Sequence, residues 1–280
     1  LFYMHFKYQS VLTIAGSDSG GGAGIQADIK TISALGCFAA SAITAVTVQD
    51  TIGVTGIHSV PAEIVRDQIK AVMNDIAPDV IKIGMINTKE LAIIIAETLR
   101  QYPAVTVIFD PVMVAASGDV LIEADTVAVL KQYLFPLAGV VTPNLDEAAI
   151  LSGMTICNLA DMKAAAQLIL ETACKAVLLK GGNLQGDNSV FDLYVDQSGR
   201  ELLLQADYIA THNIHGTGCT LSAAIAAYSA LGYTLEEAVQ HAHIYTHAAI
   251  KHGADVKTGS GNGPLNHFYN PQKLIKHEIT

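Results

Sequence analysis

Short apolar runs of strand length alternate with segments of helical periodicity along most of this chain. A strand followed by a helix and another strand forms a βαβ unit, and a series of such units builds a parallel sheet covered by helices. The alternation therefore predicts an α/β fold. The expected strands are 11–15, 42–48, 80–83, 105–109, 139–142 and 176–179, and the expected helices are 25–35, 62–73, 89–99, 125–134, 145–151 and 159–171.

The alternation stops after residue 179. Two shorter apolar segments, 190–195 and 201–205, flank the turn-forming residues 196–199, which predicts an antiparallel hairpin at the edge of the sheet. Two helices should follow at 220–231 and 235–251, the second with Thr234 as N-cap and Glu237 completing a capping box. We expect a flexible segment over residues 1–10 and a single domain over residues 11–280.

Composition limits the partners that this domain can attract. Acidic residues outnumber basic ones by 26 to 16, for a net charge of −10, which disfavours binding to nucleic acid or to an anionic membrane. The four cysteines form no C-x-x-C pair, so neither a zinc cluster nor a disulfide framework is expected. We find no signal-peptide pattern and no apolar stretch of about 20 residues, so we expect a soluble cytoplasmic protein.

A glycine-rich turn at residues 213–220 is the sharpest local signal, because it leads directly into a helix of small residues. Outward-pointing amides and the positive end of the helix dipole would bind an anion there, such as a phosphoryl group. Cys219 would lie at the helix N-terminus, where a thiol loses its proton more readily than at the usual pKa of about 8.5. The alternative is a tight turn with a buried structural cysteine.

A second glycine-rich loop, residues 16–28, lies between the first strand and the first helix, where open α/β sheets bind ligands. The spacing of Gly22, Gly24 and Ala27 matches part of the dinucleotide fingerprint, so an NAD-dependent dehydrogenase is one alternative. The context fits poorly. Five residues separate Gly16 from the fingerprint, and no acidic residue ends a second strand about 20 residues further on.

Polar residues follow three of the predicted parallel strands, although a Walker A sequence is absent. Asp110 follows one strand, Asn144 and Glu147 another, and Lys180 a third. Taken singly, such an Asn is usually a helix N-cap and such a Lys a solvated loop residue. Because the carboxyl ends of parallel strands converge on one crevice, these groups should meet and could hold a nucleotide.

Six blocks of sequence resemble the hydroxymethylpyrimidine/phosphomethylpyrimidine kinases, a vitamin-kinase branch of the ribokinase superfamily. The resemblance runs from about Val11 to Phe268 and implies a ribokinase-like α/β/α sandwich with a mostly parallel sheet and antiparallel edge strands. It also implies phosphorylation of 4-amino-5-hydroxymethyl-2-methylpyrimidine and its monophosphate in thiamine biosynthesis, with ATP and Mg²⁺, by a homodimer. The blocks are residues 15–28, 82–85, 110–113, 142–147, 179–182 and 215–220.

The resemblance assigns a role to each matching residue. Catalytic positions are Gly216, Thr217 and Gly218 as anion hole, Cys219 beside the acceptor hydroxyl, and Lys180. The positions that bind ATP and magnesium are Asp110, Asn144, Glu147, Lys180, Gly181 and Gly182, with Mg²⁺ held through water by Glu147 and Asn144. The pyrimidine pocket consists of Gly16, Asp28, Gln49, Met85 and Val112.

The pocket assignments are chemically reasonable, because the amide of Gln49 can complement an aminopyrimidine edge that the carboxylate of Asp28 satisfies in part. Without the resemblance, Asp28 reads as a solvent-facing helix residue and Met85 as a core filler. Sugar kinases of this superfamily carry Asp where Cys219 stands, so the cysteine favours the vitamin kinases. Two alternatives remain, a pyridoxal kinase of the same fold and a non-catalytic sensor that binds the same ligands.

Overall fold

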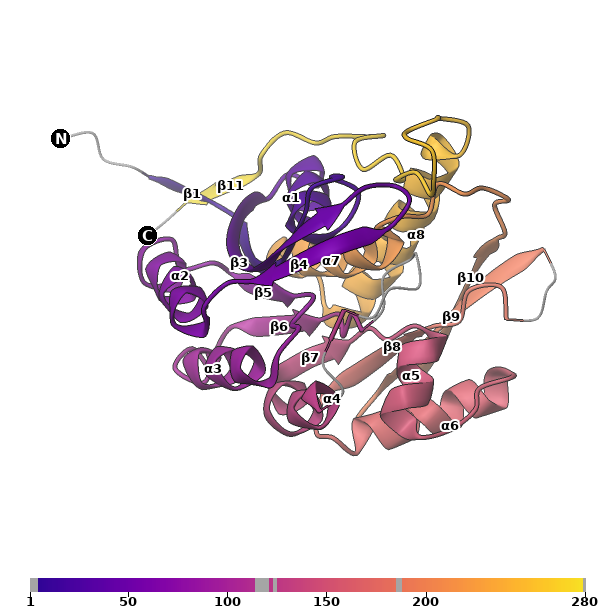
Figure 1. Ribbon diagram of the computed structural model, residues 1–280, viewed down its shortest axis with the longest axis horizontal. Coiled ribbons are helices and arrows are strands. Elements are labelled where there is room, and N and C mark those ends of the chain that lie inside the picture. The colour runs from indigo at the N-terminus through magenta and orange to yellow at the C-terminus, as the bar shows by residue number, and fades with distance from the viewer. Residues whose placement is uncertain (1–4, 114–120, 123–124, 185–187, 279–280) are drawn as a thin grey trace.

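A nine-stranded sheet runs through the computed structural model, which describes residues 5–113, 121–122, 125–184 and 188–278 (Figure 1). Its strand order is β10-β9-β8-β7-β6-β5-β2-β3-β4. The six strands from β8 to β3 are parallel, whereas β4, β9 and β10 are antiparallel at the two edges, which confirms the predicted fold class. The strands are β2 (Ser10–Asp18), β3 (Phe38–Gln49), β4 (Val54–Ser59), β5 (Val80–Ile83), β6 (Thr106–Phe109), β7 (Ala138–Val141), β8 (Ala176–Lys180), β9 (Ser189–Asp196) and β10 (Glu201–Asp207).

Helices cover both faces of this sheet and bury a separate apolar core on each side (Figure 1). The helices of one face are α2 (Ala62–Asp75), α3 (Lys89–Leu99), α4 (Thr126–Val129), α5 (Leu145–Ser152) and α6 (Leu159–Leu170), and those of the other are α1 (Gly24–Ala34), α7 (Thr217–Ala230) and α8 (Leu235–Gly253).

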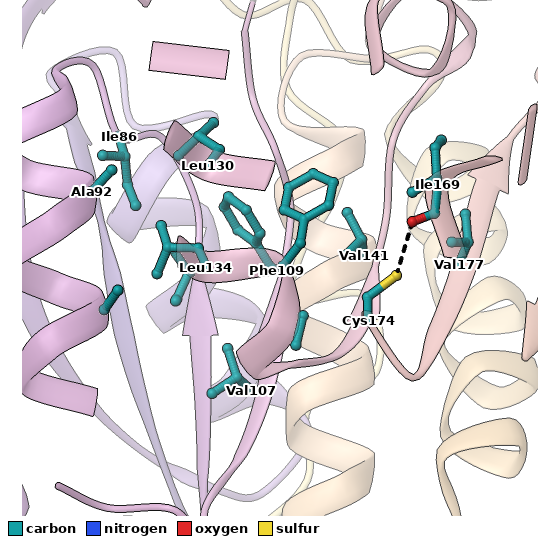
Figure 2. Close-up of a cluster of buried hydrophobic side chains, with 14 of the residues drawn as sticks. Ile86, Ala92, Val107, Phe109, Leu130, Leu134, Val141, Ile169, Cys174 and Val177 are labelled. Atoms are coloured by element: carbon teal, nitrogen blue, oxygen red, sulfur yellow. Dashed lines mark hydrogen bonds between the residues drawn. The ribbon is translucent and has the colours of Figure 1, made fainter. Parts of the chain in front are cut away.

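Figure 2 shows part of the first core, where side chains of the central strands pack against the helices. Phe109 ends β6 and meets Phe135 edge to face, with ring centroids 5.4 Å apart. Such an aromatic contact fixes the strand end firmly, because both rings are fully buried. The next residue is Asp110, so this core holds the carboxyl end of β6 in place beneath the site described below.

The elements follow the sequence pattern closely, with several differences. The hairpin partner β4 was not expected, because its residues are mostly half-buried or exposed and include Gly56, so they form no apolar run. The helix expected at 125–134 is α4 followed by a π-helical segment, Leu130–Leu134. α7 begins at Thr217 rather than at residue 220. The predicted capping box at Thr234 and Glu237 is confirmed.

Two short strands from opposite ends of the described chain lie side by side in Figure 1. β1 (Phe6–Tyr8) pairs antiparallel with β11 (Lys276–Glu278), so part of the segment that we expected to be flexible lies in a strand. Among the described residues, no helix combines the length and apolar character needed to cross a membrane.

Candidate active site

A cavity of about 690 Å³ opens at the carboxyl ends of the parallel strands. This is the edge at which open α/β sheets bind ligands. Residues from the ends of β2, β3, β5, β6, β7 and β8 meet there with the N-terminus of α7. The predicted site residues that line the cavity are Gly16, Gln49, Met85, Asp110, Val112, Asn144, Glu147, Lys180, Gly182, Gly216, Thr217, Gly218 and Cys219.

Two predicted residues, Asp28 and Gly181, do not line it. Asp28 is fully buried and binds the ammonium group of Lys82, which does line the cavity. The backbone N–H of Gly181 donates to the carbonyl of Phe191 at 2.9 Å. A Cβ atom at this glycine would lie 2.4 Å from that oxygen, so Gly181 allows β8 and β9 to approach. The expectation that Asp28 faces the solvent, made without the family resemblance, is wrong because its side chain is fully buried.

Lys180 and Asp110 form an ion pair at the end of the cavity next to α7. The Nζ atom of Lys180 lies 2.9 Å from Oδ1 of Asp110, which also accepts a hydrogen bond of 3.0 Å from Thr142. Burial alone would raise the pKa of Asp110, but the ammonium groups of Lys180 and Lys82 lower it. The pair is therefore ionised and leaves N–H groups of Lys180 to face an anion.

Glu147 lies beside this pair, with Oε2 at 4.0 Å from Nζ of Lys180. Its carboxylate accepts hydrogen bonds from the backbone N–H groups of Asn144 at 2.8 Å and Met113 at 3.3 Å. The side chain of Asn144 accepts from the N–H of Glu147, so Asn144 is the N-cap of α5. Burial raises the pKa of Glu147 to about 7, although Lys180 opposes this shift. The group therefore titrates in the physiological range.

The glycine-rich turn before α7 faces the same end. Gly216 has a φ of 85°, and a Cβ there would lie 1.8 Å from the carbonyl oxygen of Gly22, so only glycine fits. A Cβ on Gly218 would lie 3.1 Å from Nζ of Lys180 and 3.5 Å from Oδ2 of Asp110. The N–H groups in the first turn of a helix have no partner within the helix and attract anions. A phosphoryl group placed here would meet amides and an ammonium group together.

Cys219 differs from expectation. We expected its place in the first turn of α7 to favour the thiolate, but burial raises the pKa of the Cys219 thiol to about 11. The positive charge of Lys82 opposes this shift only in part, and the carboxylates of Asp28 and Asp110 add to it. The protonated thiol is therefore the resting state near neutral pH.

The other end of the cavity is more apolar. Met85 is 7% exposed and clusters with Leu121 and Val112 against the cavity. A Cβ on Gly16 would lie 2.5 Å from the Met85 methyl carbon, so the glycine makes room for this side chain. Gln49 adds an amide, whose Oε1 accepts a hydrogen bond of 3.0 Å from Thr47. An apolar wall with one amide suits a flat heteroaromatic ring.

Three residues around the cavity were not identified as site residues from the sequence, namely Lys82, Asp18 and His215. A lysine inside an apolar strand is a signal for Lys82, because such a charge needs a buried partner. Asp18 is 2% exposed and accepts hydrogen bonds from three backbone amides and from His215. Nothing in the local sequence pairs Asp18 with His215, which is 197 residues away.

A second pair of this kind, His243 and Asp192, lines the cavity beyond Lys180. Nδ1 of His243 lies 3.1 Å from Oδ2 of Asp192, while the other carboxylate oxygen accepts from the N–H of Gly181. Val190 and Ile250 add apolar surface beside the pair. This end of the cavity is thus both polar and apolar, as a nucleoside requires.

Taken together, the parallel sheet, the anion-binding turn and the facing Lys180–Asp110 pair define a small-molecule kinase of the ribokinase-like class. Comparison with known proteins narrows the assignment. Residues 18–266 match the model of the phosphomethylpyrimidine kinase family. The chain belongs to this family, and the dehydrogenase alternative is thereby excluded.

The relatives support this at high identity. The hydroxymethylpyrimidine/phosphomethylpyrimidine kinase of Rhizobium meliloti (strain 1021) is 52% identical over 260 residues, covering 92% of this chain and 96% of that protein. The phosphomethylpyrimidine kinase structure from Clostridium difficile 630 has a TM-score of 0.76 at 42% identity, covering 86% of this chain and 99% of that one. The structure of pyridoxal kinase from Staphylococcus aureus in complex with pyridoxal has a TM-score of 0.86 at 35% identity, covering 97% of this chain and 99% of that one.

Proposed function

We propose that this chain phosphorylates 4-amino-5-hydroxymethyl-2-methylpyrimidine and then its monophosphate, with ATP as donor, in thiamine biosynthesis. The observation that carries the proposal is the arrangement of the residues that line the cavity. An apolar wall with the amide of Gln49 lies at one end, and Lys180 with the turn at Gly218 lies at the other. The relatives named hydroxymethylpyrimidine/phosphomethylpyrimidine kinase are 43–52% identical to this chain, and the Rhizobium meliloti protein is covered over 96% of its length.

The nucleotide would lie along the end that holds Lys180 and His243. Structures of the Staphylococcus aureus pyridoxal kinase with ADP and with AMP-PCP support this use of a nucleotide in the fold. The acceptor oxygen would attack the γ-phosphorus, the bond from that phosphorus to the ADP oxygen would break, and the hydroxyl proton would pass to an oxygen of the transferred phosphoryl group or to water. Lys180 and the amides before α7 would bind the charge on the transferred group.

Magnesium fits the same end. The described residues contain no group of three or more His, Cys, Asp or Glu that could hold a metal by themselves. Mg²⁺ usually keeps several waters and binds one or two carboxylates together with substrate phosphates. Glu147 and Asp110 supply such carboxylates, and Asn144 is committed to capping α5. When bound, the ion would neutralise phosphate charge, while the protein's own groups position the phosphates.

Cys219 would then shape the pocket around the acceptor hydroxyl. Its thiol stays protonated near neutral pH because burial raises its pKa to about 11. A loose phosphoryl-transfer transition state needs little early removal of the hydroxyl proton. The protein can thus position the hydroxyl without a strong base at this residue.

Pyridoxal kinase is the second candidate, favoured by the TM-score of 0.86 to the Staphylococcus aureus enzyme. Gln49 and Met85 do not exclude a hydroxymethylpyridine, because its ring has a similar shape and also carries a hydroxymethyl group. The non-catalytic sensor is disfavoured, because Lys180, Glu147 and the anion-binding glycines are all in place.

One experiment separates these candidates. The purified protein is mixed with Mg-ATP and with hydroxymethylpyrimidine, its monophosphate or pyridoxal, and the release of ADP is measured for each. We expect turnover of both pyrimidines at a higher kcat/KM than that of pyridoxal. A higher kcat/KM for pyridoxal would establish the second candidate. If none of the three compounds led to ADP release, both candidates would be contradicted.

We also propose a homodimer that works in the cytoplasm. Val46 and Val48 of β3 are 48% and 63% exposed on the hairpin that ends in the edge strand β4, and Ile52 in its turn is 70% exposed. A second copy would cover these side chains. Sedimentation of wild type and of Val48→Asp tests this, with a shift to monomer expected. The four free cysteines fit a reducing compartment.

A further inference from the structure

The ring of His215, in the glycine-rich turn at residues 213–220, lies against the glycine-rich loop at residues 16–28. The ring is 8% exposed, and a Cβ on Gly22 would lie 2.3 Å from its Cδ2 atom, so only glycine allows the 16–28 loop to pack this closely against the ring. The next residue, Gly216, packs against the carbonyl oxygen of Gly22. The ring therefore contacts the 16–28 loop at Gly22, the residue that also contacts Gly216 of the anion-binding turn.

Asp18 holds this ring in one orientation. Its Oδ2 atom lies 2.9 Å from Nε2 of His215 and accepts hydrogen bonds from the N–H groups of Gly22 and Ala23 at 3.0 and 2.8 Å. Burial alone would raise the pKa of Asp18, but the hydrogen bond from His215 and those from the backbone lower it. Asp18 is thus a carboxylate, and Nε2 of His215 carries the proton that it accepts.

The same nitrogen contacts Gln49, at 3.4 Å from the amide Nε2. Because Nε2 of His215 donates to Asp18, it cannot accept from Gln49, and the amide N–H groups remain available for another partner. The amide is held on its other side by the hydroxyl of Thr47. A substrate ring that binds the amide of Gln49 would therefore change how this amide packs against the ring of His215.

We propose that Asp18 and His215 are a positioning pair that couples the acceptor pocket to the anion-binding turn. The inference rests on the proposed function. Binding of the pyrimidine at Gln49 fixes the ring of His215, the ring fixes Gly22, and Gly22 fixes Gly216 at the start of α7. Pyrimidine and nucleotide then bind more tightly together than separately, and neither residue of the pair takes part in proton transfer.

The test measures coupling directly. The Kd of AMP-PCP is determined by calorimetry with and without saturating hydroxymethylpyrimidine, and the ratio of the two values is the coupling factor. Coupling between two sites commonly reaches about 5- to 150-fold. For the wild type we expect a factor of about ten, and for His215→Phe, which keeps the ring but removes the donor, a factor near one. His215→Gln places an amide donor near the former Nε2 and should restore most of the coupling.

The second His–Asp pair provides a matched control. His243→Phe removes an imidazole that is also bonded to a carboxylate and also lines the cavity, but its partner Asp192 lies on β9 rather than in a glycine-rich loop. This change should raise the Kd of AMP-PCP by the same factor with and without the pyrimidine, so the coupling factor should not change. Kinetics should agree, with His215→Phe raising the KM of each substrate, at a saturating concentration of the other, by up to about tenfold, as expected when the coupling between the two sites is lost.

Several outcomes would overturn the inference. A wild-type ratio near one, or an unchanged ratio in His215→Phe, would show that the pair does not couple the sites. If His215→Phe does not fold, Asp18→Asn decides, since it keeps the shape of the pair but removes its charge, and an unchanged ratio there would also refute the coupling. Failure of the proposed function is separate, because it would appear as absent turnover of the pyrimidine by the wild type.

Discussion

Nζ of Lys180 lies 2.9 Å from Oδ1 of Asp110, and both groups flank the place that a side chain on Gly218 would occupy. The ion pair is assembled from residues 70 apart in the sequence and faces the first turn of α7. Lys180 is the more exposed partner, with 15% of its side chain accessible against 1% for Asp110. The carboxylate thus aims the ammonium group at the cavity.

Lys180→Ala should therefore reduce kcat by about ten- to a thousandfold, the range found when a preorganised electrostatic group is deleted. Binding of the pyrimidine, measured without nucleotide, should be close to normal because Lys180 lies at the other end of the cavity. Lys163→Ala is a control of the same type, since Lys163 forms an exposed ion pair with Glu201. Wild-type kcat in Lys180→Ala would mean that the transferred group does not bind here.

Glu147 makes activity depend on pH. Its pKa is raised by burial to about 7 from an ordinary value of 4.5, so below pH 7 the carboxyl is protonated and cannot support a metal-bound water. We expect kcat at limiting Mg²⁺ to fall as the pH decreases through 7. Glu147→Gln should remove this inflection and demand more Mg²⁺ at every pH, which a pH–rate profile at several Mg²⁺ concentrations would reveal.

The same shift affects stability with a defined sign. A pKa that is higher in the folded state favours folding at low pH, so the contribution of Glu147 is fully present below about pH 4.5 and is lost as the pH rises through 7. Without Mg²⁺, the wild type should therefore lose stability relative to Glu147→Gln between pH 5 and pH 8. A constant difference in Tm across this range would contradict the raised pKa.

Most of the sheet could be predicted because its central strands are buried on both faces and appear in the sequence as continuous apolar runs. β5 and α3 have the predicted bounds for this reason. β4 lies at an edge and lacks such a run, so nothing marked it. The start of α7 was missed because glycine and threonine at 216–218 read as a loop, although Gly216 is the N-cap.

The site was predictable where its chemistry lies at a strand end or in the glycine-rich turn before a helix. Asp110 and Lys180 follow their strands directly, and the topology of a parallel sheet brings them together. The partners of Lys82 and His215 depend instead on contacts across 54 and 197 residues, which no local pattern specifies. The pKa of Cys219 could not be predicted either, because it depends on burial by several elements rather than on its place at a helix start.

The buried pair of Lys82 and Asp28 should make the stability of the fold sensitive to the loss of either partner. Both side chains are fully buried, with Nζ of Lys82 at 2.9 and 2.8 Å from the two carboxylate oxygens. Burial alone would lower the pKa of Lys82, but the carboxylate of Asp28 raises it. Burial also raises the pKa of Asp28, although Lys82 and the hydrogen bond from Thr13 oppose this shift. The contact of Nζ with both carboxylate oxygens identifies the two groups as an ion pair. Lys82→Met leaves a buried charge without its partner, which should cost about 3–5 kcal/mol in the free energy of unfolding.

Urea denaturation would measure this cost. The double variant Lys82→Met with Asp28→Asn should recover part of the loss, because no charge is then left unpaired and the amide can still accept from Thr13. Lys163→Met, in the exposed pair with Glu201, should cost less than about 1 kcal/mol. Equal losses in Lys82→Met and Lys163→Met would show that the buried pair does not stabilise the fold as described.

Alkylation and substitution of Cys219 test whether its thiol acts as a base toward the acceptor hydroxyl. With its pKa raised by burial to about 11, fewer than about one thiol in a thousand is ionised at pH 7.5. Alkylation by iodoacetamide, followed by mass spectrometry in a Cys157→Ser background that removes the exposed thiol, should therefore accelerate only above about pH 9.

If Cys219 mainly shapes the pocket, Cys219→Ala should keep more than a tenth of the wild-type kcat from pH 6 to 9. Gly218→Val, which fills the space beside Lys180 and Asp110, should instead abolish turnover. A loss of about 10² to 10⁴ in Cys219→Ala, together with an alkylation midpoint near neutral pH, would instead identify this thiol as the base.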